Sequence, residues 1–117
     1  MKRSLVGLLF GLVLLSGCAD EGVNLIKTQH KAIKEKNFQL FLSTLSESRR
    51  EQYSNVFSQA SFMSLEQIYL KKIIVKKKYD GRMTIITLEC DKEGREFRKN
   101  YSLVKEGGWR ISSWYVE

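Results

Sequence analysis

The 117-residue chain has no proline, one histidine and two cysteines, and these scarcities exclude several kinds of structure and activity. No proline-rich linker, repeat or low-complexity segment divides the chain. A Ser-His-Asp triad would have to use His30, and no local motif supports one. No glycine-rich phosphate loop is present either. Because no catalytic signature is visible, we predict a protein that acts by binding and is not an enzyme.

Long hydrophobic runs are also lacking. The apolar run from Leu5 to Leu15 is shorter than the roughly 20 residues that a membrane-spanning helix needs. It follows Lys2 and Arg3 and ends in small residues, which is typical of a cleavable signal peptide. We therefore predict a signal peptide over residues 1–17 and no retained membrane span.

The end of this run, Leu15-Ser16-Gly17-Cys18, resembles the lipobox of bacterial lipoprotein precursors. The resemblance implies cleavage before Cys18 and lipid attached to its thiol and new amino group. Two or three acyl chains anchor a protein stably, whereas one does not. On this interpretation residues 18–22 form a lipidated tether, and membrane lipid is a partner through Cys18. The alternative is a secreted protein whose signal contains a cysteine by chance.

Location within the envelope follows from Ala19. In enteric-type bacteria an aspartate directly after the lipidated cysteine favours the inner membrane, and here the aspartate comes one residue later. The resemblance therefore favours the periplasmic face of the outer membrane if the host is Gram-negative.

Loss of Lys2 and Arg3 lowers the net charge from +7 to about +5. An exported, anchored domain rarely meets nucleic acid, so we expect no nucleic-acid partner.

Lipidation of Cys18 would leave Cys90 as a single free thiol, so no intramolecular disulfide can form. With one histidine and one free cysteine, a zinc site lacks its usual ligands, and we expect no metal and no cofactor. Cys90 ends the alternating segment that begins at Thr84. We interpret it as a small buried hydrophobic residue.

Helical periodicity dominates the first half of the mature chain. A first helix over residues 23–36 places four side chains on one face: Val23, Ile26, His30 and Ile33. Asn37 is a candidate N-cap for a short second helix with an apolar stripe: Phe38, Phe41, Leu42 and Leu45. Ser48 and Glu51 form a capping-box pattern for a third helix. Its predicted buried face is Tyr53, Val56, Phe57 and Ala60.

From residue 69 onward the period shortens, and turn signals recur. We predict strands over residues 69–79, 82–90, 95–105 and 109–116, with hairpin turns at Asp80-Gly81 and Glu106-Gly107-Gly108. Strands joined by such short turns form an antiparallel meander. Phe97, Tyr101 and Leu103 share one face of the third strand.

Two segments resemble the nuclear transport factor 2-like superfamily, the cystatin-like cone: residues 32–38 and residues 105–111. The resemblance covers residues 23–117 and implies one α+β domain, with N-terminal helices packed on a curved four-stranded antiparallel sheet. Full-length members often have a further strand or helix.

The concave side of such a cone is the expected place for a pocket, and the candidate lining residues are His30, Phe97 and Tyr101. Ketosteroid isomerase, which is similar to this superfamily, uses an aspartate base there. The three aspartates of this chain, Asp20, Asp80 and Asp91, lie outside the predicted strands. Glu89 and Glu96 lie near strand ends and are expected to face water. A pocket histidine can serve as a base, but a satisfied core residue is the commoner case.

Lys76, Lys77, Lys78 and Trp114 form the candidate interaction surface. The lysines either contact an anionic surface or protect an edge strand from aggregation. Trp109 has core parity, whereas Trp114 is either exposed or brought inward by a bulge. We predict a membrane-anchored envelope lipoprotein that binds an envelope protein. The alternatives are a small-ligand carrier, or a degenerate enzyme that uses the concave pocket, and a homodimer stays open.

Overall fold

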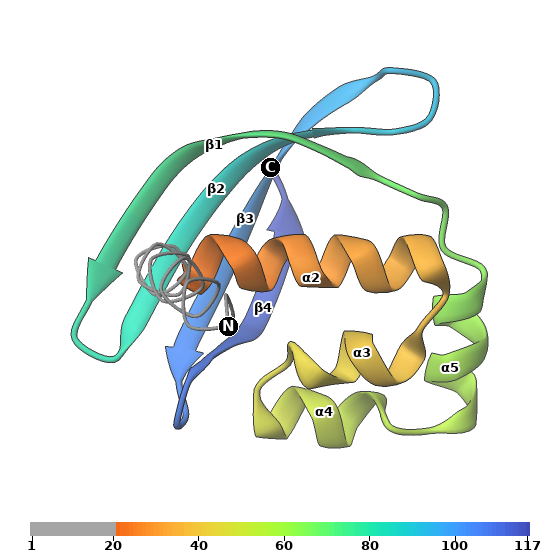
Figure 1. Ribbon diagram of the computed structural model, residues 1–117, viewed down its shortest axis with the longest axis horizontal. Coiled ribbons are helices and arrows are strands. Elements are labelled where there is room, and N and C mark those ends of the chain that lie inside the picture. Colours follow the sequence, from red (N-terminus) through yellow and green to blue (C-terminus); the bar gives the residue numbers. More distant parts are fainter. Residues whose placement is uncertain (1–20) are drawn as a thin grey trace, which may run out of the picture.

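Helix α2 (Glu21–Glu35) lies across the concave face of a curved antiparallel sheet in the computed structural model, which describes residues 21–117 (Figure 1). The predicted signal peptide and Cys18 lie outside these residues. Within residues 21–117, no helix is long and apolar enough to cross a membrane.

Three short helices connect α2 to the sheet: α3 (Phe38–Ser43), α4 (Glu47–Tyr53) and α5 (Val56–Met63). The sheet contains β1 (Tyr69–Tyr79), β2 (Arg82–Cys90), β3 (Glu96–Lys105) and β4 (Trp109–Val116), hydrogen-bonded in that order. All three strand pairs are antiparallel. The predicted α+β fold and the antiparallel meander are therefore confirmed.

The first turn of α2 touches the sheet directly. A Cβ atom added to Gly22 would lie 2.5 Å from Met83 Sδ and 3.3 Å from Leu103 Cδ2, so the missing side chain permits this close approach. The buried residues of α2 are Gly22, Ile26, Gln29 and Ala32. The buried stripe is therefore rotated from the predicted one, and Val23 and Ile33 are only partly buried.

Helix α3 begins as predicted. Asn37 Oδ1 accepts a hydrogen bond from the Leu40 N–H at 3.1 Å, which satisfies one free donor of the first turn. Phe38 and Phe41 are buried and pack against Phe62 of α5, with ring centroids 5.3 and 4.9 Å away. Aromatic packing therefore holds the short helices together.

The predicted third helix is wrong in its start and in its continuity. Helix α4 begins at Glu47, so Ser48 lies inside it and does not cap it. Helix α4 ends at Tyr53. Asn55 Oδ1 then accepts a hydrogen bond from the Ser58 N–H at 2.8 Å and caps the start of α5. This second cap reorients the chain. Val56 and Phe57, which we expected to be buried, are 78% and 85% exposed.

Irregular pairing curves the sheet and decides which side chains face inward. Register shifts occur between Leu70 and Lys72 and between Ile73 and Val75 of β1. In β2 the buried positions are Met83, Ile85, Thr87 and Glu89. The predicted face from Thr84 to Cys90 is therefore wrong, because it has the opposite parity. Cys90 is free and only partly buried.

A third irregularity lies between β3 and β4. Ser102 pairs with Ser113 and Leu103 pairs with Ile111, so Ser112 is an extra residue. The bulge changes the parity of β4, and Trp114 pairs with the inward-facing Tyr101. The bulge alternative for Trp114 is thus the correct one. Trp109, 4% exposed, is in the core as predicted.

Candidate functional site

Glu89 on β2 is the centre of a buried polar cluster, which we call the Glu89 network: Glu89, His30, Thr87 and Tyr101. The Glu89 side chain is 0% exposed, and its Oε1 lies 3.0 Å from His30 Nε2. Its Oε2 accepts hydrogen bonds from Thr87 Oγ1 at 2.7 Å and from the Tyr101 hydroxyl at 2.6 Å. One carboxylate therefore joins α2, β2 and β3.

Hydrogen-bond geometry fixes the donors of His30. Its Nδ1 lies 2.9 Å from the Ile26 carbonyl oxygen, which can only accept, so Nδ1 carries a hydrogen. Burial by itself would raise the pKa of Glu89. The hydrogen bond and charge of His30, the Tyr101 hydrogen bond and the Lys99 charge outweigh burial and hold that pKa below its usual value. Glu89 is thus a carboxylate, and His30 Nε2 donates to it.

The neighbours of the network respond to the same carboxylate. Burial, together with the charge of Glu89 and its hydrogen bond, raises the pKa of Tyr101, so the phenol stays protonated and donates. Burial lowers the pKa of Lys99, while the charge of Glu89 opposes that effect. Lys99 Nζ lies 5.1 Å from the centre of the Tyr101 ring. The network is therefore electrostatically complementary.

The three candidate pocket residues all belong to this face. His30 and Tyr101 meet on Glu89, and Phe97 pairs with Glu89 across β2 and β3. Tyr101 is 0% exposed, so it is not the wall of an open pocket. The expectation that Glu89 faces water is wrong, since it shares the parity of Met83 and Ile85. Glu96, whose side chain is 51% exposed, does face water.

Access limits what the Glu89 network can do. A general base must come within hydrogen-bond distance of the proton that it removes. Both oxygens of Glu89 are engaged by protein donors, and none of the side chain is exposed. His30, 12% exposed, borders a surface depression of about 390 Å³ between α2 and the start of β1. This arrangement suits a structural role, in which the Glu89 network links helix α2 to the sheet.

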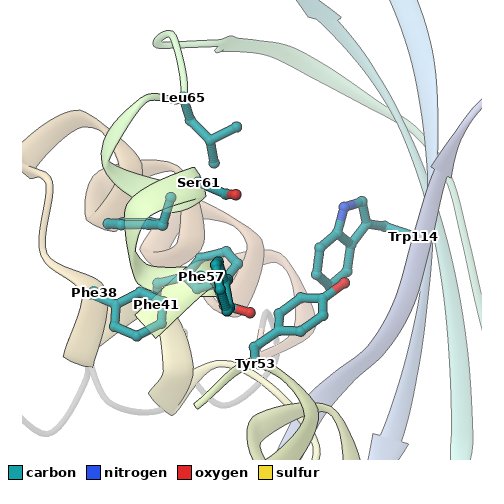
Figure 2. A pocket seen from close by; sticks show the side chains of 9 residues that line it. Phe38, Phe41, Tyr53, Phe57, Ser61, Leu65 and Trp114 are labelled. Atoms are coloured by element: carbon teal, nitrogen blue, oxygen red, sulfur yellow. The ribbon is translucent and has the colours of Figure 1, made fainter. Parts of the chain in front are cut away.

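A second site, which we call the aromatic cavity, opens between α3, α5 and β4 (Figure 2). Its volume is about 380 Å³. It is lined by Phe38, Phe41, Tyr53, Phe57, Ser58, Ser61, Phe62, Leu65 and Trp114. Figure 2 shows Trp114 extending from β4 toward Tyr53. The Trp114 ring is edge-on to Phe41 and to Tyr53, with centroids 6.3 and 6.1 Å apart.

The rim of the aromatic cavity is unusually apolar for a surface. Phe57 is 85% exposed and Leu65 43% exposed. Val56, the first residue of α5, is 78% exposed and borders a separate depression with Phe38 and Leu42. No charged side chain lines the cavity. Sequence reasoning missed this site because it assigned Phe57 to a helix core. The available signal was the density of phenylalanines between residues 38 and 62 around the Asn55 cap.

The predicted interaction surface does not form one patch. Lys76, Lys77 and Lys78 are exposed on β1, whereas Trp114 is on β4, at the opposite edge of the sheet. Trp114 belongs to the aromatic cavity instead. Among residues 21–117, no group of three or more His, Cys, Asp or Glu side chains could hold a metal ion.

Comparison with known proteins supports the fold. No protein-family model and no curated protein sequence matches the chain. Among solved structures, a designed nuclear transport factor 2-like protein superposes with a TM-score of 0.62 at 12% identity, covering 85% of this chain and 98% of that one. A SEC-C motif containing protein from Rhodopseudomonas palustris gives a TM-score of 0.57 at 17% identity, covering 80% and 76%. The chain therefore has an α+β fold of the nuclear transport factor 2-like type.

Proposed function

We propose that this chain is a lipid-anchored binding module of the bacterial cell envelope. Its partner is an envelope protein that places an apolar segment in the aromatic cavity. The observation that carries the proposal is the exposed rim of that cavity, above all Phe57 at 85% exposure. Contiguous apolar surface on a soluble domain marks a site of interaction.

The composition of the cavity favours a protein segment. Aromatic side chains are enriched and charged ones depleted at the centre of protein interfaces, and the cavity lining has both properties. Its polar groups include the hydroxyls of Ser58 and Ser61. A partner that filled the cavity and also covered Val56 and Phe57 would remove both apolar regions from water. A ligand confined to the cavity would leave Val56 exposed.

A small apolar ligand is the second candidate. The cavity volume of about 380 Å³ falls within the range of roughly 300–1,000 Å³ that is usual for small-molecule sites. Such a ligand would contact Trp114 and Phe41 and leave Val56 uncovered. It would also appear as an added mass in native mass spectrometry of the purified chain and vanish on denaturation.

The lipid anchor is tested separately through Cys18. Cys18→Ala should release the protein from the membrane fraction, because the acyl chains would no longer be attached. Fractionation that is unchanged by this substitution would sink the anchor.

Photocrosslinking in the host tests the cavity. A benzophenone side chain at position 57 should crosslink the full-length chain to one envelope protein. The same group at position 115, where Tyr115 is 57% exposed on β4, serves as the matched control. Trp114→Ala, which removes a wall of the cavity, should abolish the adduct while the protein stays folded by circular dichroism. Equal crosslinking from positions 57 and 115 contradicts the proposal. If the adduct from position 57 contains lipid or a second copy of this chain, that molecule is the occupant of the cavity and the proposed envelope protein is not.

A further inference from the structure

The end of the sheet where α2 begins is also the end nearest to the predicted anchor. Gly22 packs on Met83 and Leu103, so residue 22 is fixed to the sheet. Cys18 precedes it by four residues, a length of chain that reaches at most about 14 Å. If Cys18 carries lipid, as the proposed function holds, this end of the domain lies at the membrane surface.

Basic side chains gather at the same end, and we call this set the basic end: Lys76, Lys77, Lys78, Arg82 and Lys105. Lys78 pairs with Met83, and Lys105 follows Leu103 by two residues, so both lie on the face that α2 crosses. Lys78 Nζ and Lys105 Nζ lie 5.9 and 5.2 Å from the centre of the Trp109 ring. Because Met83 and Leu103 are the residues on which Gly22 packs, this placement puts Lys78 and Lys105 at the end of the sheet where α2 begins.

Acidic groups at this end are fewer. Glu21 is in the first turn of α2, and Asp80 is in the turn between β1 and β2. Glu106 Oε1 accepts a hydrogen bond from the Glu47 N–H at 3.0 Å, which places Glu47 at this end as a fourth acidic residue. The basic residues outnumber these carboxylates, and the local charge is positive.

We propose that the basic end lies against an anionic lipid surface when Cys18 is anchored. Lysine and arginine side chains are attracted to anionic headgroups within a Debye length of about 8 Å, and the tether holds them close to that range. Lipid anchorage then orients the domain as well as retaining it. This inference rests on the lipid anchor of the proposed function.

Orientation has a consequence for the aromatic cavity. Helix α2 has 15 residues, a length of about 22 Å, and leads from the basic end to α3. Figure 1 shows α5 beside the far end of α2 from its first residue, and α3 beginning near that end and running back beneath α2. The domain would therefore hold the cavity away from the membrane, where a soluble or peripheral envelope protein can reach it.

Lysine footprinting of the full, lipidated protein tests the inference. The protein is reconstituted in vesicles of phosphatidylethanolamine and phosphatidylglycerol, in phosphatidylcholine vesicles and in dodecyl maltoside micelles, and treated with an impermeant amine-reactive ester. In anionic vesicles the labelling of Lys77, Lys78 and Lys105 should fall by about threefold or more relative to micelles. Lys71 and Lys92, near the other end of the sheet, are internal controls and should keep their reactivity.

The outcomes separate the two proposals. If mass spectrometry finds Cys18 unmodified, the anchor fails, and the inference fails with it. If Cys18 is lipidated but the control lysines are protected as strongly as the basic end, only the inference is overturned. If Lys77, Lys78 and Lys105 are protected as strongly in phosphatidylcholine vesicles as in anionic vesicles, the role of anionic lipid is overturned. Selective protection in anionic vesicles, reduced by high salt, supports the inference.

Discussion

The buried carboxylate of Glu89 joins helix α2 to the sheet by hydrogen bonds. Removing a carboxylate from water is costly, and attraction to a partner offsets the cost only when its hydrogen bonds are satisfied. Three side-chain donors, from His30, Thr87 and Tyr101, meet this requirement. Because His30 is on α2 and Tyr101 on β3, the carboxylate fixes how the helix lies on the sheet.

Neutralising this carboxylate should therefore destabilise the fold. Glu89→Gln removes the charge that pairs with His30 and turns an amide donor toward other donors. We expect a loss of about 3 kcal/mol in the free energy of unfolding, measured by urea denaturation at pH 7. Glu96→Gln, at a position 51% exposed, is the matched control and should change stability by less than about 0.5 kcal/mol. Equal effects of the two substitutions would show that the Glu89 network contributes nothing specific.

The same residue predicts how stability depends on pH. The pKa of Glu89 is lower in the folded state than its ordinary value of 4.5, so the unfolded chain binds a proton more readily. Its stabilising contribution is present above about pH 4.5 and is lost as the pH falls through the lower, folded-state pKa.

The difference in unfolding free energy between wild type and Glu89→Gln should therefore shrink on acidification below that pH. Hydrogen bonds from the Arg95 and Glu93 backbone N–H groups and the Arg95 side chain also lower the pKa of Asp91 below its usual value. Asp91 is common to both proteins, so it cancels in the comparison. A difference that stays constant down to pH 3 would contradict the assignment.

At the scale of elements, the break between α4 and α5 depends on a side-chain cap. Asn55→Ala removes the acceptor of the Ser58 N–H and should cost about 1 kcal/mol of stability. Ser48→Ala is the matched control. Ser48 lies inside α4 and is exposed, so this substitution should leave stability nearly unchanged. Thermal denaturation of both variants measures the difference, and a larger loss for Ser48→Ala would restore the capping-box interpretation.

Local signals predicted the elements of this fold, and long-range ones were needed for its site. The hairpin glycines are a clear case, since Gly81 and Gly107 adopt φ values of 74° and 81° that other residues avoid. The N-cap at Asn37 was likewise predicted from the local sequence. By contrast, the inward parity of Glu89 and the Ser112 bulge depend on pairing between strands. In the sequence, Glu89 looks like a surface residue, because its hydrogen-bond donors His30 and Tyr101 come from other parts of the chain.

At the scale of the whole molecule, β1 and β4 are the two edge strands of the sheet, and each has one edge that pairs with no other strand of the sheet. Unpaired edges invite association with other chains, and exposed lysines oppose it. β1 is the more hazardous edge, because its 11 residues include the run Ile73-Ile74-Val75, and Ile74 is 38% exposed. Its lysines and its register shifts together make pairing with a second copy unfavourable.

Replacing two of these lysines by valine should therefore promote self-association. Lys72 and Lys77 are exposed and pair with Leu88 and Thr84, on the face opposite α2. The Lys72→Val, Lys77→Val variant, produced from residue 19 without lipid, should keep its fold and form concentration-dependent oligomers in light scattering after gel filtration.

The matched control places valines on the same convex face but away from an edge. Thr84 and Ser102 pair directly between the two central strands, so Thr84→Val, Ser102→Val adds apolar surface without changing β1. If β1 is the vulnerable edge, this control stays monomeric while the lysine variant associates. If both associate equally, the convex face drives association, and the lysines of β1 have no protective role. The distinction matters for the whole molecule, because an unguarded β1 would pair with a second copy at the strand that carries most of the basic end.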